Sequence, residues 1–298
     1  MQWFIFAIIA PMLWGITNII DKYFLTKLIK NPFSYQILTL LTDTLVLLPL
    51  ILFTKISFSY PWYLWSIIMG IIIGLVPVLY NKAMMLEEAS RVVPMFYLNP
   101  IFVLPLAYVF LNETLSFQKY VGVFLLVISA VLVSYKKLKR KFGISPALVY
   151  ILIFSLVWAG CEVSTKYIFS FIDYFSFLFW TVIGALFGGL ILLFIPKIRN
   201  DFIVDMHKVN KKKVFFWRFT TVAIYYTGVV SIYIAISIGL ISLVSAIPSL
   251  QPLFVLIYTL LLSSFMPKIL SEKSDKLIIF TKILSIILIF VGTWLVVS

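Results

Sequence analysis

Long apolar runs alternate with short polar stretches along nearly the whole chain. Divided at its charges and turn residues, the sequence contains ten apolar stretches, at residues 2–20, 34–53, 62–83, 92–110, 120–134, 146–167, 174–195, 214–238, 243–262 and 277–297. A bilayer core about 30 Å thick needs about 20 apolar residues for each helical crossing. The pattern therefore predicts an all-α integral membrane protein with ten transmembrane helices.

The composition leaves little chain for a soluble domain. Of the 298 residues, 63% are hydrophobic and 12% are charged, against about 45–50% and about 25% in soluble domains. Any chemistry must lie among the helices or in short loops, which excludes nucleotide-binding engines, Rossmann folds and nucleic-acid modules. Cys161 is the single cysteine, so the chain forms no intrachain disulfide and no thiolate metal cluster.

The net charge of +13 comes mainly from the connections between the helices. Numbered in chain order, the odd loops hold or flank 20 Lys and Arg residues and the even loops three, while Arg218 lies inside the eighth helix. Because Lys and Arg gather on the cytoplasmic side, we expect the odd loops in the cytoplasm, both termini outside, and a cell-membrane location. Lipid headgroups explain this charge, so the expected partners are membrane lipids and not nucleic acid.

The first apolar stretch lacks a basic leader region and contains Pro11 and Trp14. We therefore expect a retained helix there rather than a cleaved signal peptide.

The two halves of the sequence resemble each other. Trp14-Gly15 aligns with Trp158-Ala159, and the run at 98–104 aligns with the run at 250–256, where five of seven residues are identical. The matches keep their order, which indicates two five-helix units, at residues 1–140 and 141–298. An odd number of crossings in each unit turns the second unit upside down in the membrane, as in the inverted repeats of many secondary transporters.

The end of the first unit carries the most specific motifs, which are Leu98-Asn99-Pro100, the run Leu-Asn-Glu-Thr-Leu-Ser at 111–116, and Gly122 inside an apolar helix. Together with the paired Trp14 and Trp158, they resemble the EamA repeats of the drug/metabolite transporter superfamily. The resemblance implies ten helices and transport of small metabolites. The second unit departs from the pattern, with Phe265 or Lys268 in the place of Glu113. We therefore interpret Glu113 as a structural residue at a helix end.

Asp43 is the sharpest single candidate for function. It lies near the middle of the second apolar stretch, and an ionisable side chain at that depth is costly and commonly faces a cavity or a partner. One interpretation is a protonatable or cation-binding carboxylate in the substrate pathway. The alternative is a structural carboxylate bonded to Thr39, to Thr42 or to a neighbouring helix.

Two helix faces repeat the same order of aromatic, polar and basic residues at a spacing of four. They are Trp14, Asn18 and Lys22 in the first unit and Trp158, Glu162 and Lys166 in the second. We expect the aromatic and polar members to line a central substrate pathway from opposite sides. The alternative is an ion pair between Glu162 and Lys166 at a helix end, with both tryptophans in the interfacial belt.

Further tyrosines and amides at membrane depth complete the predicted substrate pathway: Tyr80, Asn81, Tyr97, Asn99, Tyr226 and Gln251. These amphipathic side chains suit a substrate cavity, and they also suit hydrogen bonds between helices. Asn99 and Gln251 occupy matching places in the two units, each followed by a proline that would bend its helix.

Glycines spaced four apart mark two further helix faces. Gly70 with Gly74, and Gly184 with Gly188, form patterns of small residues that permit close approach of helix backbones. We interpret both faces as packing surfaces.

These observations favour a secondary active transporter, an exporter or exchanger, that moves a small polar or amphipathic metabolite by alternating access. One alternative is an integral membrane enzyme on a lipid-linked substrate, which would need acid, base or metal groups near one interface. Another is a non-transporting membrane scaffold, which predicts a sealed core. His207 is the single histidine and lies in a polar stretch expected to be a loop, so we expect no catalytic residue, metal or cofactor. The sequence leaves the substrate, the coupling ion and the oligomeric state open.

Overall fold

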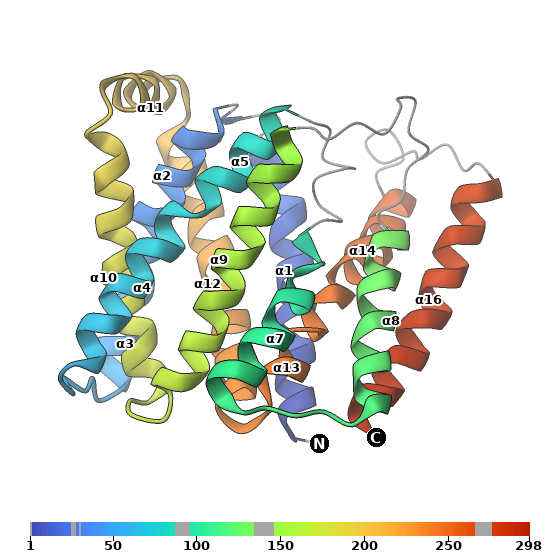
Figure 1. Ribbon diagram of the computed structural model, residues 1–298. Helices are drawn as coiled ribbons and strands as arrows, with labels where there is room; N and C mark the ends of the chain where they lie inside the picture. Colours follow the sequence, from blue (N-terminus) through green and yellow to red (C-terminus); the bar gives the residue numbers. More distant parts are fainter. Residues whose placement is uncertain (1, 25–27, 30, 87–95, 134–145, 266–275) are drawn as a thin grey trace.

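The computed structural model describes residues 2–24, 28–29, 31–86, 96–133, 146–265 and 276–298, and every regular element assigned within them is a helix. In chain order these are α1 (Gln2–Tyr23), α2 (Pro32–Asp43), η2 (Thr44–Val46), α3 (Leu47–Phe53), α4 (Trp62–Leu75), α5 (Pro77–Leu86), α7 (Asn99–Leu111), α8 (Phe117–Val133), α9 (Pro146–Ile168), α10 (Tyr174–Leu193), α11 (Pro196–Lys208), α12 (Lys211–Ile238), α13 (Ile241–Val244), η3 (Ile247–Leu250), α14 (Gln251–Phe265) and α16 (Lys276–Val297). Both chain ends lie at the same end of this helical bundle, and α11 lies at the opposite end (Figure 1).

Seven segments of the described chain are long and apolar enough to cross a membrane: Gln2–Asp21, Pro32–Phe53, Trp62–Tyr80, Val149–Ile168, Tyr174–Leu193, Lys212–Ile238 and Ile241–Tyr258. Three further apolar helices are shorter: Asn99–Leu111, Phe117–Leu132 and Ile283–Val297. Many large apolar side chains are exposed, for example Phe110 at 67% and Phe290 at 71%, and apolar surface of this extent suits contact with lipid. The chain is a multi-pass helical membrane protein.

Several of the predicted spans are interrupted. The second stretch is divided by η2 between α2 and α3. The third is divided at Pro77, because a proline cannot donate a backbone N–H to the preceding turn. The ninth consists of α13, η3 and α14, with Pro248 inside η3. Each of these stretches is therefore built from more than one helical segment. Residues 92–95 of the fourth stretch lie outside the described residues, and its helix α7 begins at Asn99.

The polar stretch between α10 and α12 is also helical. Pro196 opens α11 at a position where a missing N–H costs nothing. Asn31 Nδ2, just before α2, donates a hydrogen bond to Asp201 Oδ2 of α11 at 3.2 Å. The expectation of a loop around His207 is therefore wrong, because this segment forms a short polar helix anchored to the start of α2.

Two glycines let α4 and α10 pack backbone against backbone. A Cβ atom on Gly70 would lie 2.1 Å from the carbonyl oxygen of Thr181, and one on Gly184 would lie 2.1 Å from that of Ile67. No side chain fits at either place, so the predicted packing faces of small residues are confirmed.

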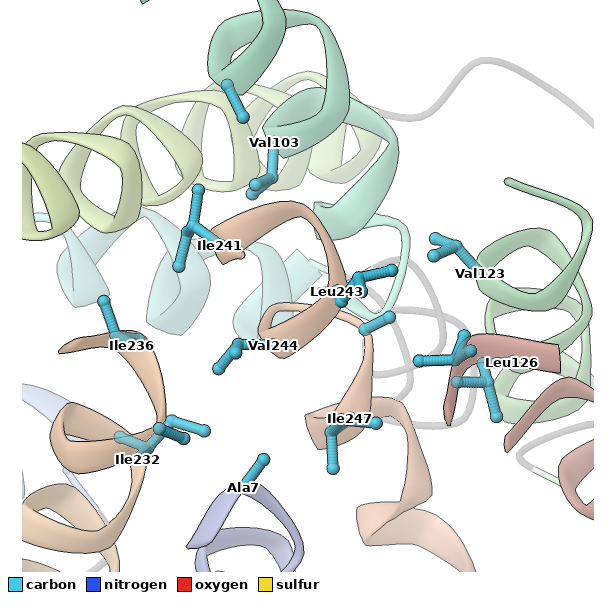
Figure 2. Close-up of a cluster of buried hydrophobic side chains, with 14 of the residues drawn as sticks. Ala7, Val103, Val123, Leu126, Ile232, Ile236, Ile241, Leu243, Val244 and Ile247 are labelled. Atoms are coloured by element: carbon cyan, nitrogen blue, oxygen red, sulfur yellow. The ribbon is translucent and has the colours of Figure 1, made fainter. Parts of the chain in front are cut away.

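The largest buried apolar cluster surrounds the short helix α13 (Figure 2). Ile241 and Val244 of α13 pack there with side chains of α1, α7, α8, α12 and η3. Both residues, with Ile232 and Ile236 of α12, also face a cavity. The cluster therefore forms a solid apolar wall on one side of that cavity.

Candidate substrate cavity

A cavity of about 340 Å³ lies among the helices of both halves of the chain. Its walls come from α1, α4, α7, α9, α10, α12, α13, η3 and α14. Along α1 the lining extends from Trp14 to Asp21, a rise of about 10 Å at 1.5 Å per residue. The volume lies within the range of small-molecule sites, about 300–1,000 Å³.

Eight of the eleven residues predicted for the substrate pathway line this cavity: Trp14, Asn18, Tyr97, Asn99, Trp158, Glu162, Tyr226 and Gln251. They include all three pairs that the internal repeat treats as equivalent. Asp43 and Tyr80 are not among the lining residues. The side chain of Asn81 lies outside the described part of the structure.

Glu162 of α9 and Asn99 of α7 meet at the cavity wall. Asn99 Nδ2 donates a hydrogen bond to Glu162 Oε2 at 2.8 Å. Because an ionised carboxylate only accepts hydrogen bonds, this contact directs the amide nitrogen toward Glu162. The Oδ1 atom of Asn99 is then left without a hydrogen-bond partner among the described residues. Asn99 is 5% exposed, so this acceptor is buried.

Lys166 does not form the ion pair with Glu162 that the sequence offered as an alternative. Its Nζ donates instead to the carbonyl oxygens of Ile236 at 2.7 Å and Gly239 at 2.8 Å. These carbonyls belong to the C-terminal end of α12, where a positive charge is favourable. Lys166 is therefore a cap for α12, and that alternative is wrong.

Glu113 has a similar role at the start of α13. Its Oε1 accepts from the backbone N–H of Ile241 at 2.9 Å, and its Oε2 accepts from the N–H of Ser242 at 2.9 Å and from the Ser242 hydroxyl at 2.6 Å. Free N–H groups at a helix start attract a carboxylate. The interpretation of Glu113 as a structural residue is confirmed, and the contact joins the first half of the chain to the second.

The two tryptophans of the repeat line the cavity and are held there by their neighbours. Trp14 Nε1 donates to the carbonyl oxygen of Tyr225 at 3.3 Å, and a Cβ atom on Gly228 would lie only 2.7 Å from that nitrogen. Trp158 stacks on Phe154 with ring centroids 5.7 Å apart. Contact with α12 therefore positions the Trp14 ring, and the missing side chain of Gly228 makes room for it.

Asp43 is bonded to a neighbouring helix, as the structural alternative expected. Arg218 Nη2 of α12 donates to Asp43 Oδ1 at 3.2 Å, and Arg218 Nε donates to Thr42 Oγ1 at 3.0 Å. Arg218 is 3% exposed. A buried charge is stable only when it is paired and hydrogen-bonded, so this guanidinium joins α12 to α2.

The same network reaches the cavity through Asp21. Arg218 Nη1 donates to the Tyr35 hydroxyl at 3.2 Å, and that hydroxyl donates in turn to Asp21, which lines the cavity. Sequence reasoning missed Asp21, Tyr35 and Arg218. A signal was present, because Arg218 is a lone charge inside an apolar helix and such a residue needs a buried carboxylate nearby.

The cavity wall combines aromatic rings with hydrogen-bonding groups. Its aromatic side chains are Trp14, Phe96, Tyr97, Trp158, Tyr225, Tyr226 and Tyr233. No group of three or more His, Cys, Asp or Glu side chains that could hold a metal occurs within the described ranges. The arrangement can bind a small molecule that has a flat apolar part and polar groups.

The fold and the cavity define a multi-pass helical membrane protein with room for a small solute. Residues 1–135 match the model of the EamA-like transporter family. The match confirms the predicted resemblance to EamA-type transporters of the drug/metabolite transporter superfamily.

The curated proteins contain no match to this chain. Among solved structures, 28 chains match. One of them, titled "Crystal structure of protein", is 17% identical and has a TM-score of 0.70, with 98% of this chain and 96% of that chain covered. At this identity the likeness shows that the two chains share a fold.

Proposed function

We propose that the protein is a secondary active transporter, an exporter or exchanger, that moves a small polar or amphipathic metabolite across the cell membrane by alternating access. The observation that carries this proposal is the cavity of about 340 Å³, lined by equivalent residues of the two halves. A non-transporting scaffold predicts a sealed core, so the cavity favours transport. In transporters built from inverted repeats, the solute site lies near the repeat interface.

Ten membrane crossings are supported by the positions of the chain ends. Both ends lie on the same side of the bundle (Figure 1), which requires an even number of crossings. The seven longest apolar segments alone would put the ends on opposite sides of the membrane. Adding the three shorter apolar helices, Asn99–Leu111, Phe117–Leu132 and Ile283–Val297, gives ten.

Several local features support two inverted units, at residues 1–140 and 141–298. The helix α1 runs away from the end that holds the chain termini, whereas its equivalent α9 runs toward it (Figure 1). Asn31 and Asp173 occupy equivalent places and act alike, because each side chain accepts hydrogen bonds from the second and third backbone N–H groups that follow it. α1 packs against α12 and α14, and α9 packs against α5 and α7, which are the corresponding partners.

The two halves are not packed identically, which supports alternating access. α4 lies along α10 in extensive contact, whereas the corresponding helices α12 and α2 touch only sparsely. Exchange of the tight and the loose arrangement between the halves would move the opening of the cavity from one side of the membrane to the other.

The test is uptake and efflux of a metabolite panel in proteoliposomes, with and without a pH gradient. Cys161 lines the cavity and is the single cysteine, so a membrane-permeant maleimide should inhibit the wild-type protein, and a transported solute should slow the inhibition. The matched control is Cys161→Ala, which should transport and resist the reagent. A folded protein that moves no solute in either direction would contradict the proposal.

A further inference from the structure

Both charged side chains on the described cavity wall are acidic. They are Asp21 on α1 and Glu162 on α9. In the described part of the chain, the cations near the cavity are bonded elsewhere, since Arg218 is buried against Asp43 and Lys166 caps the end of α12. Neither of them lines the cavity. A low-dielectric cavity with carboxylates on its wall attracts cations and repels anions.

Two buried polar atoms on the same wall, both able to accept a hydrogen bond, have no partner among the described residues. One is Asn99 Oδ1, whose amide nitrogen is already bonded to Glu162. The other is Ser245 Oγ, at the end of α13. Each residue is 5% exposed, and each lines the cavity. Buried polar groups are nearly always hydrogen-bonded, so these acceptors favour a ligand that brings N–H donors to them.

Building on the transport function proposed above, we propose that the solute is a protonated primary amine with a flat apolar body. Its ammonium group binds at Glu162 and donates an N–H to Asn99 Oδ1, with Ser245 Oγ as a further acceptor. An ammonium of this kind has three N–H donors and a charge that complements the carboxylate. A quaternary ammonium has the charge but no donor, so it leaves both acceptors unpaired.

The aromatic wall fits the rest of such a solute. Trp14 and Trp158 stand on helices from opposite halves, and both line the cavity together with Tyr97 and Tyr233. Aromatic faces attract a cation within about 6 Å of the ring centre, and they pack against a flat apolar body. Tryptophan gives the strongest attraction of the aromatic side chains.

Among the described residues, neither helix start at the cavity offers an equivalent site to a carboxylate on the same solute. The start of α14 lies at the cavity, but the backbone N–H of Gln251 is already bonded to the carbonyl oxygen of Pro248. The start of α7 faces Glu162, which is bonded to Asn99 there. A simple amine should therefore bind better than the corresponding amino acid.

The test compares four solutes of similar shape that differ in charge: 2-phenylethylamine, 2-phenylethanol, 3-phenylpropionate and phenylalanine. Binding to the purified full chain is measured by calorimetry, and counterflow is measured in proteoliposomes. We expect the amine to bind at least tenfold more tightly than the alcohol and the two carboxylates. Glu162→Gln should remove this preference for the amine, while the affinity for the alcohol changes less than twofold. Glu162→Asp, which keeps a carboxylate, should retain part of the preference.

Asp205→Asn is the control. It neutralises a carboxylate on α11 that does not line the cavity, and it should change the amine affinity less than threefold. The absence of an amine preference, including failure of all four compounds to bind, would overturn this inference even if the metabolite panel reveals transport of another solute. If Glu162→Gln lowered the affinity for every compound equally, the proposal of amine binding at Glu162 would also be overturned. Failure of the folded protein to transport any solute would count against the transport function itself.

Discussion

Arg218 Nη2 lies 3.2 Å from Asp43 Oδ1, although 175 positions separate the two residues in the sequence. The guanidinium also lies 3.9 Å from Asp21 Oδ1. One buried cation therefore stands between two carboxylates from different helices of the first half. Loss of the cation leaves two negative charges facing each other, whereas loss of one carboxylate leaves a cation that is still paired.

This arrangement predicts an unequal response to substitution. Arg218→Gln should destabilise the protein by about 3–5 kcal/mol, because two carboxylates lose their common partner. Asp43→Asn should cost only about 1 kcal/mol, because the amide oxygen still accepts a hydrogen bond and Asp21 still balances the charge. Thermal unfolding of the two purified variants in detergent shows which substitution lowers the stability more. An equal loss of stability in the two variants would contradict the description of Asp21 as a second counter-ion of Arg218.

Asp43 also permits a test of coupling. If its carboxylate takes up and releases a proton during transport, Asp43→Asn should abolish accumulation driven by a pH gradient and leave substrate counterflow at least partly intact. Accumulation and counterflow in proteoliposomes separate the two activities. Equal loss of both in a folded protein would indicate substrate binding or structure, and unchanged accumulation would eliminate Asp43 and leave Glu162 as the next candidate.

The sequence located much of the cavity wall because the repeat marks equivalent positions. Trp14, Glu162 and Asn99 each have a matching position in the other half of the repeat, and they line one cavity. The pairing of Asp43 with Arg218 was not predicted, since helix periodicity places residues on a face but does not identify the helix opposite. The break between α13 and α14 at η3 was not predicted either. A proline predicts a bend, but it does not distinguish a kinked helix from two separate helices.

The direction of insertion can be tested at two exposed places. His207 lies on α11 at one end of the bundle, and Thr114 lies between α7 and α8 at the end that holds the chain termini (Figure 1). Because of the excess of Lys and Arg in the odd loops, we expect α11 in the cytoplasm. In a Cys161→Ala background, His207→Cys should react in intact cells only with permeant thiol reagents, whereas Thr114→Cys should also react with impermeant ones. The reverse labelling would show that the protein is inserted in the opposite orientation. The argument for two inverted units would still hold.

The place of Trp14 depends on the absence of a side chain at Gly228. A Cβ atom there would lie 2.7 Å from Trp14 Nε1 and 3.1 Å from its Cδ1, so Gly228→Ala must displace the indole from the cavity wall or separate α1 from α12. We expect transport affinity to fall roughly tenfold, or about 1.4 kcal/mol, measured as the concentration dependence of uptake in proteoliposomes.

Gly160 provides the matched control, because a Cβ atom built on it meets nothing within 4 Å. Gly160→Ala replaces a helical glycine by the residue with the best helix propensity, which stabilises a helix by about 1 kcal/mol. It should therefore leave transport unchanged and raise the melting temperature slightly. If Gly228→Ala and Gly160→Ala transport equally well, the position of the Trp14 ring does not matter for the solute, and the aromatic wall must be assigned to other side chains.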